Sequence, residues 1–191
     1  MSVKKTVGVI IGSTRTHRVG GTIAQWFVDN SGISEDFNVE IIDLAKENLP
    51  LYDEALPPMA LNGVYSTEHG KRWQAKIGAL DSFVFVTSEY NRGYPAALKN
   101  AIDYLWKEWC DKPAAIVSYG WSHGGQFAGE QLSQIISGMS GIQTKLVSAR
   151  PKVFLSRDIF NESGKIADPN TSFAKYNDDI KKAVEELKAK F

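Results

Sequence analysis

A run of apolar residues in the middle of the chain, SFVFVT at residues 82–87, constrains the fold most strongly. Apolar and polar side chains do not alternate in this run. A strand of this kind is typical of a parallel sheet with both faces covered by helices. Shorter β-branched or apolar runs predict further strands at residues 7–11, 39–44, 114–119, 145–147 and 153–155.

Segments with helical spacing separate these strands. Apolar residues recur every three or four positions in residues 19–27, 98–109, 127–139 and 173–187, and residues 71–80 form a shorter helix candidate. Strands that alternate with helices predict an α/β fold with right-handed crossovers. About five such units favour a three-layer flavodoxin-like fold, in which a five-stranded parallel sheet carries helices on both faces. We expect residues 1–191 to form a single domain.

Charge and cysteine content narrow the class of protein. The 22 basic and 22 acidic residues leave no net charge, so nothing in the total favours nucleic acid as a partner. The single cysteine, Cys110, excludes an internal disulfide framework and a cysteine-rich zinc site, and it fits a reducing cytoplasm. No apolar run reaches the ~20 residues that span a bilayer, and residues 7–11 are too short for a signal peptide. We therefore expect a soluble cytoplasmic protein without a bound metal.

Ligands of open α/β sheets bind beyond the carboxyl ends of the strands. The loop after the first strand, GSTRTHRVGG at residues 12–21, leads into a helix whose free amides favour an anion. Ser13 and Thr14 can donate hydroxyl hydrogen bonds, and Arg15 and Arg18 can add charge-assisted ones. The loop is neither a Walker A loop nor a GxGxxG loop. It is a phosphate cradle in composition, or else a polar loop with an ordinary helix cap.

Two further loops should lie at the same edge. Residues 87–95, TSEYNRGYP, combine tyrosines and an asparagine that suit a flat polar aromatic ligand, or form an ordinary turn. Residues 118–125, SYGWSHGG, contain glycines that let the backbone approach a ligand closely. Alternatively, these glycines only form a flexible connection to the next helix. His123 is either a proton donor or a solvent-facing loop residue.

At these residues the chain resembles the NADPH-dependent FMN reductase family, which includes flavodoxin-like quinone, azo-dye and chromate reductases. The matching stretches are GSTRTHRVG, LPLYDE at residues 49–54, TSEYNRGYPAALKNAIDYL and SYGWSHGG, in the family's order within residues 5–155. One departure is Ser88, where the family usually has proline. The serine adds an amide hydrogen and loosens the turn. The resemblance is weaker after Pro151, and no function is carried over to that segment.

The resemblance implies FMN as cofactor and NADPH or NADH as co-substrate, with hydride passing to FMN and on to a quinone-like acceptor. It implies the FMN phosphate at Ser13, Thr14, Arg15 and Arg18, and the isoalloxazine ring against Glu89, Tyr90, Asn91, Arg92 and Gly93. Ser118, Tyr119, Gly120 and Gly124 would border the ring. Gly120, Trp121 and Ser122 are expected to help stabilise the reduced ring, and His123 is a candidate proton donor for the reduced acceptor.

The resemblance also implies a homodimer or homotetramer, with the flavin near the subunit interface. Trp106 and Trp109 are then interface residues or, alternatively, core residues. A preference for NADPH needs a site for the 2′-phosphate, for which Arg92, Arg72 and Lys71 are candidates.

Two other functions remain open at this point. A flavodoxin-type electron carrier is usually strongly acidic, which disagrees with zero net charge. The long stretch at residues 45–70 could form a substrate pocket, which a carrier does not need. A non-flavin binder of nucleotides or sugar phosphates would explain the first loop but not SEYN.

Overall fold

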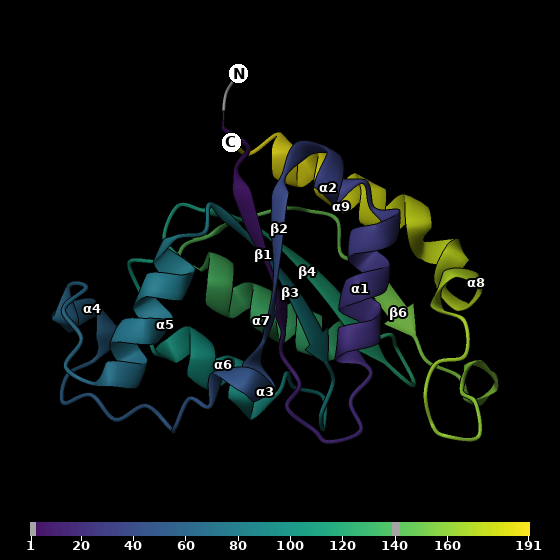
Figure 1. Cartoon of the computed structure of the whole chain (residues 1–191), viewed down its shortest axis with the longest axis horizontal. Coiled ribbons are helices and arrows are strands. Elements are labelled where there is room, and N and C mark those ends of the chain that lie inside the picture. The colour runs from purple at the N-terminus through teal and green to yellow at the C-terminus, as the bar shows by residue number, and fades with distance from the viewer. Residues whose placement is uncertain (1–2, 139–141) are drawn as a thin grey trace.

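The computed structural model describes residues 3–138 and 142–191, and within them a parallel sheet forms the middle layer (Figure 1). The strand order is β2-β1-β3-β4-β5, and β6 also pairs with β4. The strands are β1 (Thr6–Ile11), β2 (Asn38–Asp43), β3 (Ser82–Ser88), β4 (Pro113–Gly120), β5 (Lys145–Leu146) and β6 (Lys152–Phe154). All registered pairs are parallel, as the apolar runs predicted.

The fifth position of the sheet is shared by two short strands. β5 pairs with the start of β4, at Pro113 and Ala114, and β6 pairs with its end, at Ser118 to Gly120. Between them, Glu186 of the last helix accepts hydrogen bonds from the Ser148 and Ala149 amides. The predicted flavodoxin-like sheet is therefore confirmed, with its last strand interrupted.

Helices cover both faces of the sheet (Figure 1). The longer helices are α1 (Gly20–Asn30), α5 (Glu68–Gly78), α6 (Ala96–Asp103), α7 (Gln126–Ser137) and α9 (Asn177–Lys188). The shorter ones are α2 (Ile33–Asp36), α3 (Leu44–Glu47), α4 (Pro58–Leu61), α8 (Pro169–Phe173) and the 3₁₀ turns η1 (Arg157–Ile159) and η2 (Ala174–Tyr176).

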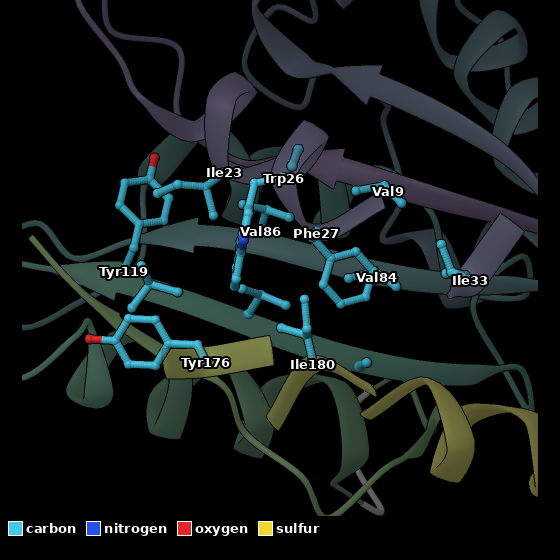
Figure 2. Packing of buried hydrophobic residues seen from close by; sticks show 14 of the residues in the cluster. Val9, Ile23, Trp26, Phe27, Ile33, Val84, Val86, Tyr119, Tyr176 and Ile180 are labelled. Carbon is cyan, nitrogen blue, oxygen red and sulfur yellow. The ribbon is translucent and has the colours of Figure 1, made fainter. Parts of the chain in front are cut away.

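Two apolar cores separate the three layers. On one face, Phe27 of α1 and Ile180 of α9 pack with Val84 and Val86 of β3 (Figure 2). On the other, α5, α6 and α7 pack against the phenylalanines of β3. β3 is buried at every position, which explains why its sequence shows no alternation.

Two predicted helix boundaries differ clearly from the structure, and a third lies partly outside the described residues. α6 ends at Asp103, so Trp106 and Trp109 lie in the turns beyond it. The last helix, predicted from Phe173, is preceded by α8 and η2 and begins at Asn177. Met139, predicted in the fourth helix, lies outside the described residues.

The long stretch predicted at residues 45–70 is held by hydrogen bonds to α6 and, just before α5 begins, to itself. Asn100 of α6 accepts from the Tyr52 amide and donates to the Pro50 carbonyl. Glu54 accepts hydrogen bonds from the hydroxyls and amides of Ser66 and Thr67, just before α5. These bonds, led by that of the Ser66 hydroxyl, lower the pKa of Glu54 to about 2.

The described residues contain neither a membrane-spanning helix nor a metal-binding cluster. None of the helices among them is both long and apolar enough to cross a bilayer. Nor do they gather three or more histidine, cysteine, aspartate or glutamate side chains in a metal-binding arrangement.

Candidate functional site

A pocket of about 140 Å³ lies at the carboxyl edge of the sheet, where the loops after β1, β3 and β4 meet. The segment after β6 forms a fourth part of its wall. The lining residues are Ser13, Arg15, His17, Arg18, Val19, Ser88, Glu89, Tyr90, Tyr119, Gly120, Trp121, Leu155, Phe160 and Gly164. The expectation that three predicted loops share this edge is confirmed.

The first loop ends at the amino end of α1, which has no side-chain cap. Val19 occupies the cap position without a side-chain hydrogen bond. The amides of the first turn therefore remain available, and the helix dipole favours an anion beside them. A Cβ atom at Gly20 would lie 2.8 Å from the Tyr119 hydroxyl, so only glycine lets this ring reach the helix end. The site thus offers hydroxyls and free amides at one point.

The polar side chains of the first loop have different partners. Ser13 is buried, and its hydroxyl lies 2.5 Å from that of Tyr90. The Arg15 guanidinium is exposed and lies 5.9 Å from the centre of the Tyr90 ring. Arg18 forms an ion pair with Asp43 at 2.7 Å. Arg15 is therefore the available cation of this loop, whereas Arg18 also ties the loop to the end of β2.

The second loop is a two-residue hairpin with a left-handed backbone. Asn91 (φ +49°) and Arg92 (φ +67°) form its tip, and the Tyr90 and Gly93 backbones exchange two hydrogen bonds. A type I′ turn requires positive φ at both positions and usually contains glycine at the second. Here the Arg92 guanidinium lies 4.1 Å from the centre of the Phe127 ring, a cation–π contact that anchors the turn to α7.

Glu89 joins the second loop to the same helix. Its carboxylate accepts a hydrogen bond from the Ala128 amide in the first turn of α7. A carboxylate at a helix amino end is stabilised by the free amides and the dipole. Glu89 thus positions the second loop and also lines the pocket.

The third loop is packed so closely that two of its positions require glycine. Gly124 and Gly125 have φ of +59° and +74°. A Cβ atom would lie 2.9 Å from the Lys152 backbone at Gly124 and 2.7 Å from the Tyr119 backbone at Gly125. Ser118 is buried and donates a hydrogen bond to the Gly124 carbonyl. These residues shape the loop rather than line the pocket.

Tyr119 and Ser88 form a polar floor inside the pocket. Burial raises the pKa of Tyr119 to about 12, so this phenol is a neutral hydrogen-bond donor at physiological pH. The Ser88 hydroxyl is buried beside it, and its interaction with the Tyr119 hydroxyl offsets part of that rise in pKa. Ser88 and Tyr119 therefore offer two neighbouring hydroxyl groups to a molecule bound in the pocket.

Several predicted site residues lie outside the pocket lining. They are Thr14, Asn91, Arg92, Gly93, Ser118, Ser122, Gly124 and the proton-donor candidate His123. Thr14 lines a separate cavity with Asn48 and Ala97. The His123 ring is exposed and packs edge-on against Phe127. These assignments stay predictions.

Sequence reasoning missed the fourth part of the wall, at Leu155, Phe160 and Gly164. The resemblance to the family is weaker after Pro151, so it assigns no function to this segment. A signal was present, because VFL at residues 153–155 was itself a predicted parallel strand. Its carboxyl end had to lie at the same edge as the other three.

The fold and the pocket define a flavodoxin-like protein with an uncapped helix end beside a pocket lined by Tyr90, Tyr119, Trp121 and Phe160. The profile of the NADPH-dependent FMN reductase family matches residues 6–151, and the chain belongs to this family. It is 38% identical over 192 residues to an NAD(P)H-dependent FMN reductase of Schizosaccharomyces pombe, covering 100% of this chain and 92% of the relative. It is 30% identical to a quinone reductase of Pseudomonas putida, covering 91% and 90% of the two chains.

The fold has solved counterparts. The NAD(P)H:acceptor oxidoreductase FerB of Paracoccus denitrificans superposes with a TM-score of 0.71 at 23% identity, over 97% of this chain and 98% of that one. The protein is accordingly an enzyme, an NAD(P)H-dependent FMN oxidoreductase, and the electron-carrier alternative is not favoured. The uncapped end of α1 fits the FMN phosphate, and the buried hydroxyls of Ser88 and Tyr119 line the same pocket.

Proposed function

We propose that this enzyme oxidises NAD(P)H with FMN held in the carboxyl-edge pocket and delivers the electrons to quinone-like acceptors. The observation that carries the proposal is the uncapped amino end of α1, which opens into a pocket walled by Tyr90 and Trp121. A phosphate and a flat ring can be bound together there.

The residues of this chain supply binding and orientation. The Ser13 hydroxyl, the Arg15 guanidinium and the first amides of α1 would hold the phosphate. Glu89 and Tyr90, fixed by α7 and by Ser13, would form one side of the ring site. When bound, FMN supplies the redox chemistry, accepting a hydride from NAD(P)H and yielding two electrons to the acceptor.

The other predicted site residues would shape the loops around the cofactor. Thr14, Arg18, Asn91, Arg92 and Gly93 complete the loops that would hold FMN. Ser118, Gly120 and Gly124 keep the third loop against the pocket. Whether His123 donates a proton to the acceptor stays a prediction, to be tested through the pH profile of quinone turnover in His123→Ala.

The nucleotide preference depends on a cation that can meet the 2′-phosphate of NADPH. Arg92 is exposed beside the pocket loops, where its contact with the Phe127 ring holds the guanidinium in place and makes it one candidate. Lys71 already pairs with Glu68 on the exposed face of α5. Arg72, also exposed, is the other candidate.

We further infer that the protein is a cytoplasmic homodimer. Each subunit would consist of one FMN-binding domain that spans residues 1–191. A groove of about 500 Å³ between α4, α6 and α7 is lined by Met59, Ile102 and Trp106 among others, and it supports an apolar subunit contact. Met59 is 57% exposed at the edge of this groove, so its side chain is available for such a contact. Trp109 is fully buried among Phe83, Phe85 and Trp73, so it belongs to the core.

The test is an anaerobic visible spectrum of the FMN-loaded protein, recorded before and after adding NADPH and, separately, NADH. The proposal expects bleaching that depends on the protein and colour restored by a quinone. FMN binding without bleaching would return the electron-carrier alternative. No FMN binding would mean that the pocket holds another ligand.

A further inference from the structure

We propose that Trp121 and Phe160 form a stacking surface for the electron acceptor, and that this pair makes the enzyme favour acceptors with fused aromatic rings. The inference rests on the proposed function, because the acceptor must reach the same pocket as the flavin. It adds a specificity role for a segment beyond the part of the chain that the family profile covers.

The two rings lie almost parallel at the pocket. Trp121 is the first residue after β4, and 58% of its surface is exposed. Its ring centre lies 5.5 Å from that of Phe160, with 22° between the ring planes. Both residues line the pocket. An exposed indole backed by a second ring is a ready face for a flat ligand, because aromatic rings prefer offset stacking.

The segment that carries Phe160 is held in place by its backbone. The Leu155 amide donates to the Gly120 carbonyl at 3.0 Å, which fixes the segment beside the end of β4. Phe160 and Ile166 form an antiparallel bridge, and the Asn161 amide donates to the Lys165 carbonyl at 2.8 Å. Phe160 is therefore a fixed support, and little ordering is required when a ligand stacks.

The turn between the bridged residues is closed by one side chain. The Asn161 carboxamide oxygen accepts hydrogen bonds from the amides of Ser163 and Lys165 and from the Ser163 hydroxyl. Ile166 is buried in the core on the α1 side of the sheet. The Asn161 side chain thus fixes the tip of the turn, and the buried Ile166 fixes the strand that leaves it. These contacts keep Phe160 beside Trp121.

Charge favours an uncharged ring over the nicotinamide nucleotide as the occupant. Residues 155–166 carry Arg157 and Lys165 against Asp158 and Glu162, so this wall has no net charge. The cations that line the pocket, Arg15 and Arg18, come from the first loop, and Arg18 is paired with Asp43. A pyrophosphate would find no net positive charge on this wall, whereas a neutral quinone needs none.

The experiment compares acceptors that can stack to different extents, using the FMN-loaded enzyme. KM is measured for 1,4-naphthoquinone, 1,4-benzoquinone and ferricyanide in wild type, Trp121→Ala and Phe160→Ala. We expect the ratio of KM for naphthoquinone to KM for ferricyanide to rise about three- to tenfold in each variant, as loss of one aromatic pair implies. The rise for benzoquinone should be smaller, and Trp121→Phe should restore most of the preference.

A binding measurement without turnover supports the kinetics. Equilibrium dialysis of 2-naphthol, a redox-inert two-ring compound, against FMN-loaded Trp121→Ala should show affinity weakened by a similar factor. Phe154→Ala is the matched control, because Phe154 is an exposed aromatic residue on the adjacent β6 that does not line the pocket. It should leave both the KM ratio and 2-naphthol binding as in wild type.

Three results would overturn the stacking surface. One is an equal rise in KM for naphthoquinone and ferricyanide. Another is a change confined to the KM for NADPH, which would assign the pair to the nucleotide. The third is loss of FMN affinity with no change in acceptor preference. Failure of the proposed function is separate, because it appears as absence of NADPH-dependent bleaching in the wild-type protein.

Discussion

The hydroxyl groups of Ser13 and Tyr90 lie 2.5 Å apart, 77 positions apart in the chain, and join the loop after β1 to the loop after β3. Both residues line the pocket, where the proposed phosphate site meets the proposed ring site. Because it links two loops that otherwise belong to different strands, its removal should alter both the stability of the protein and the binding of FMN.

We predict that Tyr90→Phe lowers the free energy of unfolding of the FMN-free protein by about 1 kcal/mol, the usual contribution of one hydrogen bond. The phosphate of FMN offers Ser13 other acceptors, so the deficit should shrink at saturating FMN. Urea denaturation with and without FMN measures both values. Tyr94→Phe is the control, because Tyr94 takes no part in this contact, and an equal deficit with and without FMN would contradict the expectation.

Arg15→Ala should raise the Kd for FMN about ten- to a hundredfold. The guanidinium would make a charge-assisted hydrogen bond to the phosphate, worth roughly 1.5–3 kcal/mol. Quenching of flavin fluorescence gives the Kd directly. Arg72→Ala removes an exposed arginine from α5 and should leave FMN affinity as it is. An unaltered Kd in Arg15→Ala would refute the phosphate assignment.

Glu54 should make stability sensitive to acid. The pKa of this carboxyl is lowered from 4.5 to about 2 in the folded protein, so its contribution is complete above pH 4.5 and is lost as the pH falls towards 2. Glu54→Gln should lower the free energy of unfolding by about 1 kcal/mol at pH 7 and flatten its fall between pH 5 and pH 2. Thermal denaturation across this range tests it, with Glu185→Gln on α9 as the control.

Alanine substitutions at Gly125 and Gly164 distinguish the cost of backbone strain from the cost of steric overlap. Their φ values are almost equal, +74° and +72°, but a Cβ atom meets the Tyr119 backbone at 2.7 Å in one and nothing within 4 Å in the other. Gly164→Ala should cost about 1 kcal/mol, the strain of a left-handed alanine. Gly125→Ala should cost more than about 3 kcal/mol. Equal losses in urea denaturation would mean that the third loop can move.

The subunit contact can be tested through Met59. Met59→Asp places a charge in the groove beside Trp106 and should shift a dimer towards monomer, because burying an unpaired carboxylate is unfavourable. Light scattering after size-exclusion chromatography measures the mass. Ile41→Asp, at an exposed apolar position of β2, is the matched control. A dimer that persists in Met59→Asp would place the interface elsewhere.

The sequence by itself determined the layers and the place of the site. The unbroken apolar run of β3 required helices on both faces, and parallel strands required their following loops to share one edge. Ser13, Arg15, Glu89 and Tyr90 could be assigned to that edge because each follows a strand directly.

Only the tertiary structure decided which side chains face the pocket. The sequence placed Trp106 and Trp109 on one helical face and left interface and core open for both. Because α6 ends at Asp103, the two separate: Trp109 is fully buried in the core, whereas Trp106 lines a groove. Phe160 is 39 residues from Trp121 and becomes its neighbour only through the pairing of β6 with β4. A local sequence pattern shows the periodicity of a helix or strand. Contacts between distant residues depend on where the chain turns and which strands pair, and a short stretch of sequence does not contain that information.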